Sequence, residues 1–199
     1  MLKISCWNSD WATPASKRGK FFIDKFDSDI ICLTEGYETL LPQDGYMISS
    51  NEDYGYKIQK GRRKVILWSK NKWTEVNQIG SKEIPTGRFI SGVTNGIKIV
   101  GLCIPWRFAH VSTGRKDRKP WEDHLSFIKN LSFSNEKTII LGDFNQNVPN
   151  KNQPEIVFSS LKKMIDGFNL LTSNMGLVHI VISTDLKAKS IQKVATEDN

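Results

Sequence analysis

The sequence predicts a layered α/β protein. Short apolar segments recur along the chain, and segments with the periodicity of amphipathic helices lie between some of them. Several apolar segments are near-continuous hydrophobic runs, which is typical of strands that are covered on both faces. We therefore expect strands at residues 2–7, 29–34, 45–49, 64–69, 88–93, 97–104, 137–142 and 178–183.

Three segments are predicted to be helices that bury one face. They span residues 15–27, 120–131 and 154–168, and Pro120 suits the first turn of the second helix. Apolar stripes of this kind indicate core packing rather than a cofactor site. Because 199 residues suffice for one substantial core, we expect a single domain over residues 1–199.

Composition places the chain among soluble globular proteins. Hydrophobic residues make up 39% and charged residues 25% of the sequence. No apolar run is long enough to span a bilayer, so a membrane is not an expected partner. Cys6, Cys32 and Cys103 each lie in an apolar strand-like run without metal-site spacing. They are typical of buried thiols in a reducing compartment, and we expect a cytoplasmic protein.

The charge balance favours a polyanionic partner. Twenty-eight basic and 21 acidic residues give a net charge of +7, which attracts nucleic acid. Part of the excess lies in two runs: Lys57, Lys60, Arg62, Arg63 and Lys64, and then Arg115, Lys116, Arg118 and Lys119. The alternative is that both runs are solvated loops.

The stretch from Thr138 to Gln146 is the most informative motif. Apolar residues lead into Gly142, and Asp143 and Asn145 follow two positions apart. A buried strand that ends in this way delivers both side chains to a sheet edge, pointing roughly the same way. The carboxylate can orient or deprotonate a water, and the amide can hold a phosphate oxygen, which suits phosphate ester hydrolysis. The alternative is a simple Asp-Asn turn.

Two other predicted strands also end in polar side chains. Asn8 and Asp10 follow the first strand, and Glu35 follows the second. If these strand ends converge, their carboxylate and carbonyl oxygens suit Mg²⁺ or Mn²⁺. Glu35 alone would more often be a solvated loop residue.

These motifs together resemble the endonuclease/exonuclease/phosphatase family. The segments "CWNSD", "DIICLTEG", "GRF", "CIPW" and "ILGDFNQ" occur in the family's order, and the resemblance covers about residues 2–186. It implies a deoxyribonuclease I-like fold: a four-layer sandwich of two packed mixed β-sheets with helices on the outer faces. It also implies metal-dependent phosphoester hydrolysis at one edge of the sandwich.

The resemblance assigns a role to each polar strand end. Glu35 matches the principal metal ligand, with Asn8 and Asp10 beside the metal. Asp143 matches the residue that orients or activates the attacking water, and Asn145 matches the amide that contacts the scissile phosphate.

The middle motifs leave alternatives open. Arg88 either reaches a phosphate with its fork of donors or is a surface arginine on an edge strand. Trp106 and Arg107, with His110 and Trp121, either form a stacking platform for bases or help to close a core. Cys103 lies where many family members have a His or Tyr, and we expect it to be a packed thiol.

The chain departs from the family near its end. Val178 takes the place of the family's aspartate, and the neighbouring His179 is expected to be a structural histidine. The family's last strand, which follows a Ser-Asp-His triplet, is expected to be missing from this chain, which would leave a sheet edge unpaired.

Three functions follow as hypotheses. The first is a Mg²⁺-dependent or Mn²⁺-dependent phosphodiesterase that acts on nucleic acid. The second is a weakened or inactive relative that binds phosphate or nucleic acid, and the third is a hydrolase of small phosphate esters.

Overall fold

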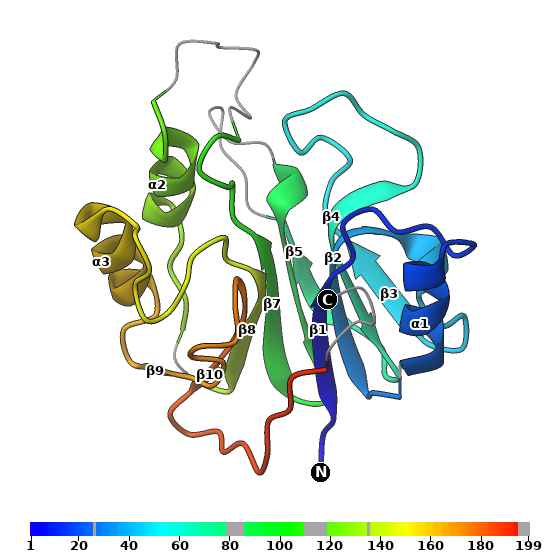
Figure 1. Ribbon diagram of the computed structural model, residues 1–199. Helices are drawn as coiled ribbons and strands as arrows, with labels where there is room; N and C mark the ends of the chain where they lie inside the picture. Colours follow the sequence, from blue (N-terminus) through cyan, green and yellow to red (C-terminus); the bar gives the residue numbers. More distant parts are fainter. Residues whose placement is uncertain (26, 79–85, 110–118, 135, 195–199) are drawn as a thin grey trace.

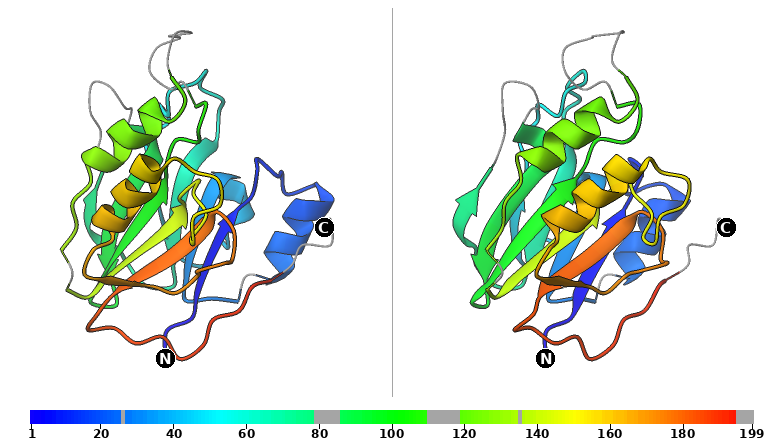
Figure 2. Two further views of the ribbon diagram at one scale, coloured as in Figure 1. Left: turned by 60° about the vertical axis from the view of Figure 1, so that its left-hand side comes forward. Right: turned by 90° about the vertical axis from the view of Figure 1, so that its left-hand side faces the viewer.

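Two β-sheets pack face to face, and helices cover their outer faces (Figure 1). The computed structural model describes residues 1–25, 27–78, 86–109, 119–134 and 136–194. The four-stranded sheet has the order β1-β2-β4-β3, and the six-stranded sheet has the order β5-β6-β7-β8-β10-β9. Helices α2 and α3 lie on the outer face of the larger sheet, and α1 lies beside the smaller one (Figures 1 and 2). The predicted four-layer sandwich is confirmed.

The elements follow in chain order. They are β1 (Ile4–Asn8), α1 (Lys17–Lys25), β2 (Ile30–Tyr37), β3 (Tyr46–Ser49), β4 (Arg62–Ser69), β5 (Thr74–Asn77), β6 (Phe89–Thr94), β7 (Ile97–Cys103), α2 (Glu122–Lys129), β8 (Thr138–Asp143), α3 (Glu155–Met164), β9 (Phe168–Leu170) and β10 (Val178–Ser183). Short 3₁₀ turns also occur at Glu38–Leu40 and Thr86–Arg88.

Central strands such as β2 and β8 are continuous apolar runs because each of them serves two cores. In β8, Ile139 and Leu141 pack in the core between the sheets, whereas Ile140 packs in the core under α2 and α3. In β2, Cys32 belongs to the core between the sheets and Leu33 to the core on the outer face. Neighbouring residues of a strand point to opposite faces, so both must be apolar.

All eight predicted strands are present, one with the predicted bounds, 178–183, and the others with shifted bounds, but two short strands were not predicted. All four residues of β5 are exposed, and β9 has three residues, so neither carries a strong hydrophobic pattern. The predicted helix over 154–168 was too long, because α3 ends at Met164 and Phe168 begins β9. Residue 26 of the predicted helix over 15–27 lies outside the described residues.

The alternative that the first basic run is a solvated loop does not hold for its last three residues. Arg62, Arg63 and Lys64 begin β4, and Lys64 is buried. The second run lies outside the described residues except for Lys119.

The strand β1 lies at one side of its sheet. Among the residues that the structure describes, β2 is its one strand partner. The chain after β10 passes the lower end of β1 without forming a strand up to residue 194 (Figures 1 and 2). Of the helices described, none combines the length and the apolar character that crossing a bilayer requires.

Candidate active site

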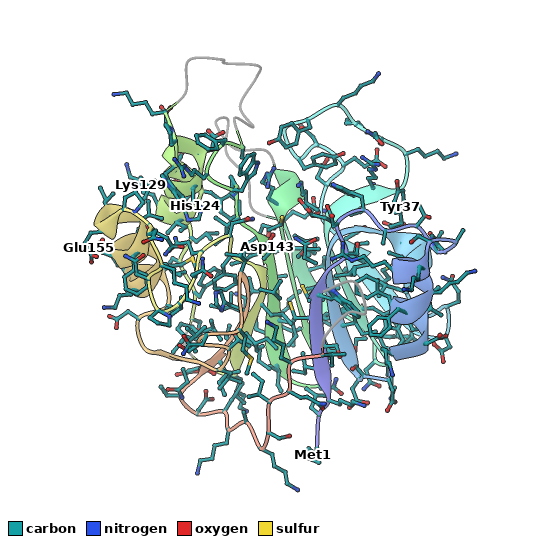
Figure 3. All side chains as sticks on the ribbon, in the orientation of Figure 1. Met1, Tyr37, His124, Lys129, Asp143 and Glu155 are labelled. Carbon is teal, nitrogen blue, oxygen red and sulfur yellow. The ribbon has the colours of Figure 1, made fainter. Side chains whose placement is uncertain are left out.

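Gly142 allows β8 to end with Asp143 between the two sheets. Its φ of 141° lies in the region that favours glycine, and a Cβ at this position would lie 1.9 Å from the Leu102 carbonyl oxygen. Asp143 has the same parity as Ile139 and Leu141, so it continues the face that packs toward the other sheet. Figure 3 shows Asp143 near the middle of the molecule, between the layers.

The Asp143 carboxylate is buried and held by donors from two segments. Its Oδ2 accepts a hydrogen bond from Asn8 Nδ2 at 2.8 Å, and its Oδ1 accepts one from the Asn145 backbone N–H at 3.0 Å. The residue is only 4% exposed. Burial raises the pKa of Asp143 to about 6, and the nearby Glu35 carboxylate adds to the rise, while the hydrogen bonds from Asn145 and Asn8 oppose it.

The Asn8 side chain therefore links β1 to β8 by a hydrogen bond. It ends β1, and its side-chain oxygen accepts a hydrogen bond from the backbone N–H of Asp10 at 2.8 Å. The Asp10 carboxylate turns toward the surface, where its side chain is 70% exposed and lies 3.4 Å from the Arg18 guanidinium. Of the two predicted polar residues after β1, Asn8 contacts Asp143 and Asp10 faces Arg18.

Glu35 reaches the site through an unusual backbone conformation. Strand alternation alone would place it on the outer face with Ile31 and Leu33. Its φ of 51° lies in the left-handed region, which is strained for a residue with a side chain. The Ser9 hydroxyl and the Trp11 backbone N–H both donate to the Glu35 carbonyl, each at 2.7 Å. These bonds hold the strained backbone of β2 at Glu35.

The Glu35 carboxylate forms an ion pair with the buried Lys64 ammonium. Both groups also act electrostatically on Asp143: Glu35 raises its pKa and Lys64 lowers it. Sequence reasoning placed Lys64 in a basic run and at the start of the predicted strand 64–69, but it assigned Lys64 no role in the site. The signal that was available is its position directly before the apolar run that begins at Val65.

Asn145 lies next to Asp143, as predicted. Its φ of 52° is a conformation that asparagine tolerates well. The side-chain Nδ2 donates to the Ile104 carbonyl at 2.8 Å, which fixes the amide at the end of β7. The turn alternative is thus realised, and the turn positions the amide beside Asp143, so it is compatible with the proposed site.

Arg88 is buried, so the surface alternative was wrong. Only 1% of the residue is exposed, because it directly precedes β6 and packs across β7. Its Nε donates to the Tyr54 carbonyl and its Nη1 to the Cys103 carbonyl, both at 3.2 Å. Nη2 has no hydrogen-bond partner among the described residues. Cys103 is buried as expected, and burial raises the pKa of its thiol to about 12.

Trp106 and Arg107 form an exposed patch after β7. Trp106 is 49% exposed, so it does not close a core. Its ring meets the Phe108 ring edge-on at 5.5 Å, and the Arg107 guanidinium lies 4.5 Å from the Phe108 centroid. Trp121 packs instead against His124, with ring centroids 5.1 Å apart. His110 lies outside the described residues.

His179 is a structural histidine, as predicted. It is fully buried, its Nε2 donates to the Gln146 carbonyl at 2.8 Å, and its Nδ1 accepts from the Thr172 hydroxyl at 3.1 Å. Val178 lies directly opposite Asp143 in the pairing of β8 with β10. An aliphatic side chain therefore occupies the position next to the carboxylate.

The donors at this site have the chemistry that a hard divalent ion needs. The described part of the chain contains no group of three or more His, Cys, Asp or Glu able to hold a metal. The Glu35 carboxylate and the Asn8 amide nevertheless supply oxygen ligands of the type that Mg²⁺ and Mn²⁺ prefer. Glu35 also holds a cation already, the Lys64 ammonium, which shows that this position favours positive charge.

A two-sheet sandwich with a buried carboxylate at the edge between its sheets has the architecture of the deoxyribonuclease I-like hydrolases. Residues 22–152 match the model of the Endonuclease/Exonuclease/phosphatase family, and the chain belongs to this family. Its members are hydrolases that act on phosphate esters and are generally dependent on divalent metals. No curated protein matches the sequence.

Solved structures show the same fold at low sequence identity. An AP endonuclease from Archaeoglobus fulgidus is 16% identical, with a TM-score of 0.64 over 91% of this chain and 86% of that one. A variant of the 3' phosphatase NExo from Neisseria, bound to a product DNA hairpin, is 14% identical, with a TM-score of 0.64 over 93% and 88%. A β-hairpin deletion mutant of beta toxin from Staphylococcus aureus is 16% identical, with a TM-score of 0.56 over 100% and 93%.

Proposed function

We propose that the chain hydrolyses phosphate ester bonds of nucleic acid at the Asp143 site. The observation that carries this proposal is the buried Asp143 carboxylate, held by Asn8 and by the Asn145 backbone close to Glu35. A carboxylate held in one orientation can position a water and accept its proton. Membership of a family of phosphate ester hydrolases supports the reaction class.

The remaining groups suit a phosphate that lies over Asp143. The Asn145 amide steadies a phosphate oxygen as negative charge develops on it. Arg88 Nη2 is a buried cationic donor that no described residue partners, and a phosphate oxygen would match it. We assign Asn145 and Arg88 to substrate binding and Asp143 to the water.

We propose Glu35 and the side-chain oxygen of Asn8, with Asp10 next to them, as the residues that would hold Mg²⁺ or Mn²⁺. When bound, such an ion neutralises charge on the phosphate. The free thiols of Cys6, Cys32 and Cys103 fit a reducing compartment, and we propose the cytoplasm.

Nucleic acid is the substrate class that charge and similarity favour. The net charge of +7 attracts a polyanion, and one solved structure of the same fold holds a DNA product. The exposed Trp106 ring beside Arg107 provides a surface on which a base can stack.

The test is turnover of labelled DNA and RNA oligonucleotides with Mg²⁺ or Mn²⁺ by the wild-type chain and by Asp143→Asn. We expect Asp143→Asn to lose at least about 100-fold in turnover, because the amide accepts no proton from water. Asp27→Asn, which removes an exposed carboxylate, is the matched control and should keep wild-type turnover. Equal turnover by Asp143→Asn and the wild type would contradict the proposal. Faster release of phosphate from soluble phosphomonoesters than cleavage of oligonucleotides would assign the site to small esters instead.

Val178 favours a second candidate, a phosphate-binding relative without turnover. It lies opposite Asp143, and His124 and His179, the histidines that the structure describes, have both ring nitrogens hydrogen-bonded elsewhere. Salt-sensitive binding of oligonucleotides without cleavage under any divalent ion would select this candidate.

A further inference from the structure

Lys64 is a buried cation in the centre of the proposed site. Its side chain is 7% exposed and the side chain of its partner Glu35 is 20% exposed. The two residues face each other across β2 and β4, between the paired positions Thr34–Val65 and Gly36–Arg63. An ammonium taken out of water needs a compensating charge, and Glu35 supplies it.

Aromatic rings enclose the other sides of the Lys64 ammonium. The Trp11 centroid lies 5.1 Å from its nitrogen, and the centroids of Tyr54 and Tyr56 lie 5.8 and 5.9 Å away. The negative faces of such rings stabilise a cation. The ammonium is therefore held at Glu35 by a built environment, unlike an exposed lysine that meets a carboxylate by chance.

The Glu35 carboxylate is also the principal residue that we propose to hold a divalent ion. An ammonium and a divalent ion at one carboxylate repel each other strongly, because little water lies between them to screen the charges. The two cations therefore compete for the negative charge of Glu35, whose Oε1 the Lys64 ammonium already contacts.

We propose that Lys64 is the resident cation of the Glu35 site and that a divalent ion binds there only by displacing it. This inference rests on the proposed role of Glu35 but not on turnover. Lys64 thereby lowers the affinity of the site for the divalent ion. Its competition sets the ion concentration at which the site becomes occupied.

The first test measures Mn²⁺ binding to the purified full chain by electron paramagnetic resonance of the free ion. We expect Lys64→Met to bind Mn²⁺ at least about tenfold more tightly than the wild type, because the competing charge is gone. Lys64→Arg keeps the charge and should stay near the wild-type affinity. Lys70→Met, which removes an ion-paired lysine at Asp29, controls for net charge and should change the affinity by less than about twofold.

The proposal requires that the tighter Mn²⁺ binding of Lys64→Met occur at Glu35. The double variant Glu35→Gln with Lys64→Met should lose it, and it also leaves no unpaired buried charge. If Lys64→Met binds Mn²⁺ no more tightly than Lys70→Met does, or if the double variant binds as tightly as Lys64→Met, the proposal is overturned.

The second test uses the wild-type chain, so it does not depend on whether a variant folds. Reductive methylation followed by mass spectrometry reports how accessible each ammonium is. We expect saturating Mn²⁺ to accelerate methylation of Lys64 several-fold and to leave Lys70 unchanged. An unchanged rate at Lys64 overturns the proposal. Neither test measures cleavage, so displacement of Lys64 without turnover would refute the proposed function alone.

Discussion

Two buried polar clusters lie in different layers of the molecule and differ in kind. Between the sheets, the charged groups of Glu35, Lys64 and Asp143 interact with one another. Under α2 and α3, His124 and His179 bond to neutral groups: the Pro105 and Gln146 carbonyls, the Gln146 amide and the Thr172 hydroxyl. Figure 3 shows His124 on the α2 side, apart from Asp143.

The charged cluster therefore has groups suited to catalysis, whereas the neutral cluster stabilises the fold. Burial lowers the pKa of both histidines, which keeps them neutral, and their nitrogens are used in packing the helices and loops. Each cluster holds one polar atom without a hydrogen-bond partner among the described residues: Gln146 Oε1 in the neutral cluster and Arg88 Nη2 in the charged one. The Asp143 cluster differs in retaining charge and strained backbone at Glu35. An unpartnered charged donor inside a protein is costlier than a neutral group, so Arg88 points to a ligand.

The largest expected effect comes from distorting the backbone at Gly142, which precedes Asp143 of the charged cluster. Gly142→Ala should destabilise the fold by about 3 kcal/mol or more, since the new Cβ meets the Leu102 carbonyl oxygen at 1.9 Å. Urea denaturation measures this loss. Gly96→Ala is the matched control, because φ is also positive there but no atom lies within 4 Å of the new Cβ. Equal losses in the two variants would contradict the steric explanation.

The neutral cluster should make stability depend on pH through His124. Burial lowers its pKa to about 4 from the ordinary value of 6.5, so between these values the unfolded chain binds more protons than the folded one. Its contribution is therefore fully present above pH 6.5 and is lost as the pH falls toward 4. The loss is on the order of 3 kcal/mol.

His124→Gln should reduce this dependence, which urea denaturation at several pH values between about 4 and 7.5 measures. Part of the dependence should remain, because the pKa of His179 is lowered in the same direction. Turnover at neutral pH should change little if the cluster is structural. A large loss of turnover without a loss of stability would indicate that His124 takes part in the reaction.

The smallest effect is expected at the exposed rim of the charged cluster. Trp106→Ala should weaken binding of a single-stranded oligonucleotide by about tenfold, since stacking contributes ~1–3 kcal/mol per base. Its effect on stability should be small because Trp106 is 49% exposed. Fluorescence anisotropy measures the binding. Tyr46→Ala removes a ring of similar exposure on β3, in the other sheet, and should leave the affinity unchanged.

Sequence reasoning worked where one local pattern carried the information. The apolar runs predicted strands because each run fills two cores, and the Gly142 motif located Asp143 because a glycine at that strand end has a steric cause. Sequence reasoning did not predict that Lys64 is buried, and for Arg88 it left a surface position open beside a phosphate contact, because charged residues are usually exposed. Their burial depends on partners far away in sequence, such as Tyr54 for Arg88 and Glu35 for Lys64.

The sequence by itself determined the layered fold, the family and the strand ends at Asn8 and Asp143, because periodicity and motif order are local properties. It placed Glu35 just after a strand, whereas β2 continues through Glu35 to Tyr37. Only the tertiary structure decided which of these groups meet. The Asn8–Asp143 hydrogen bond joins residues 135 positions apart, and the left-handed backbone at Glu35 reverses the face that alternation assigns to it. The first contact arises because the two sheets pack, whereas the pairing of β2 with β4 places a cation, Lys64, at the carboxylate proposed for the metal.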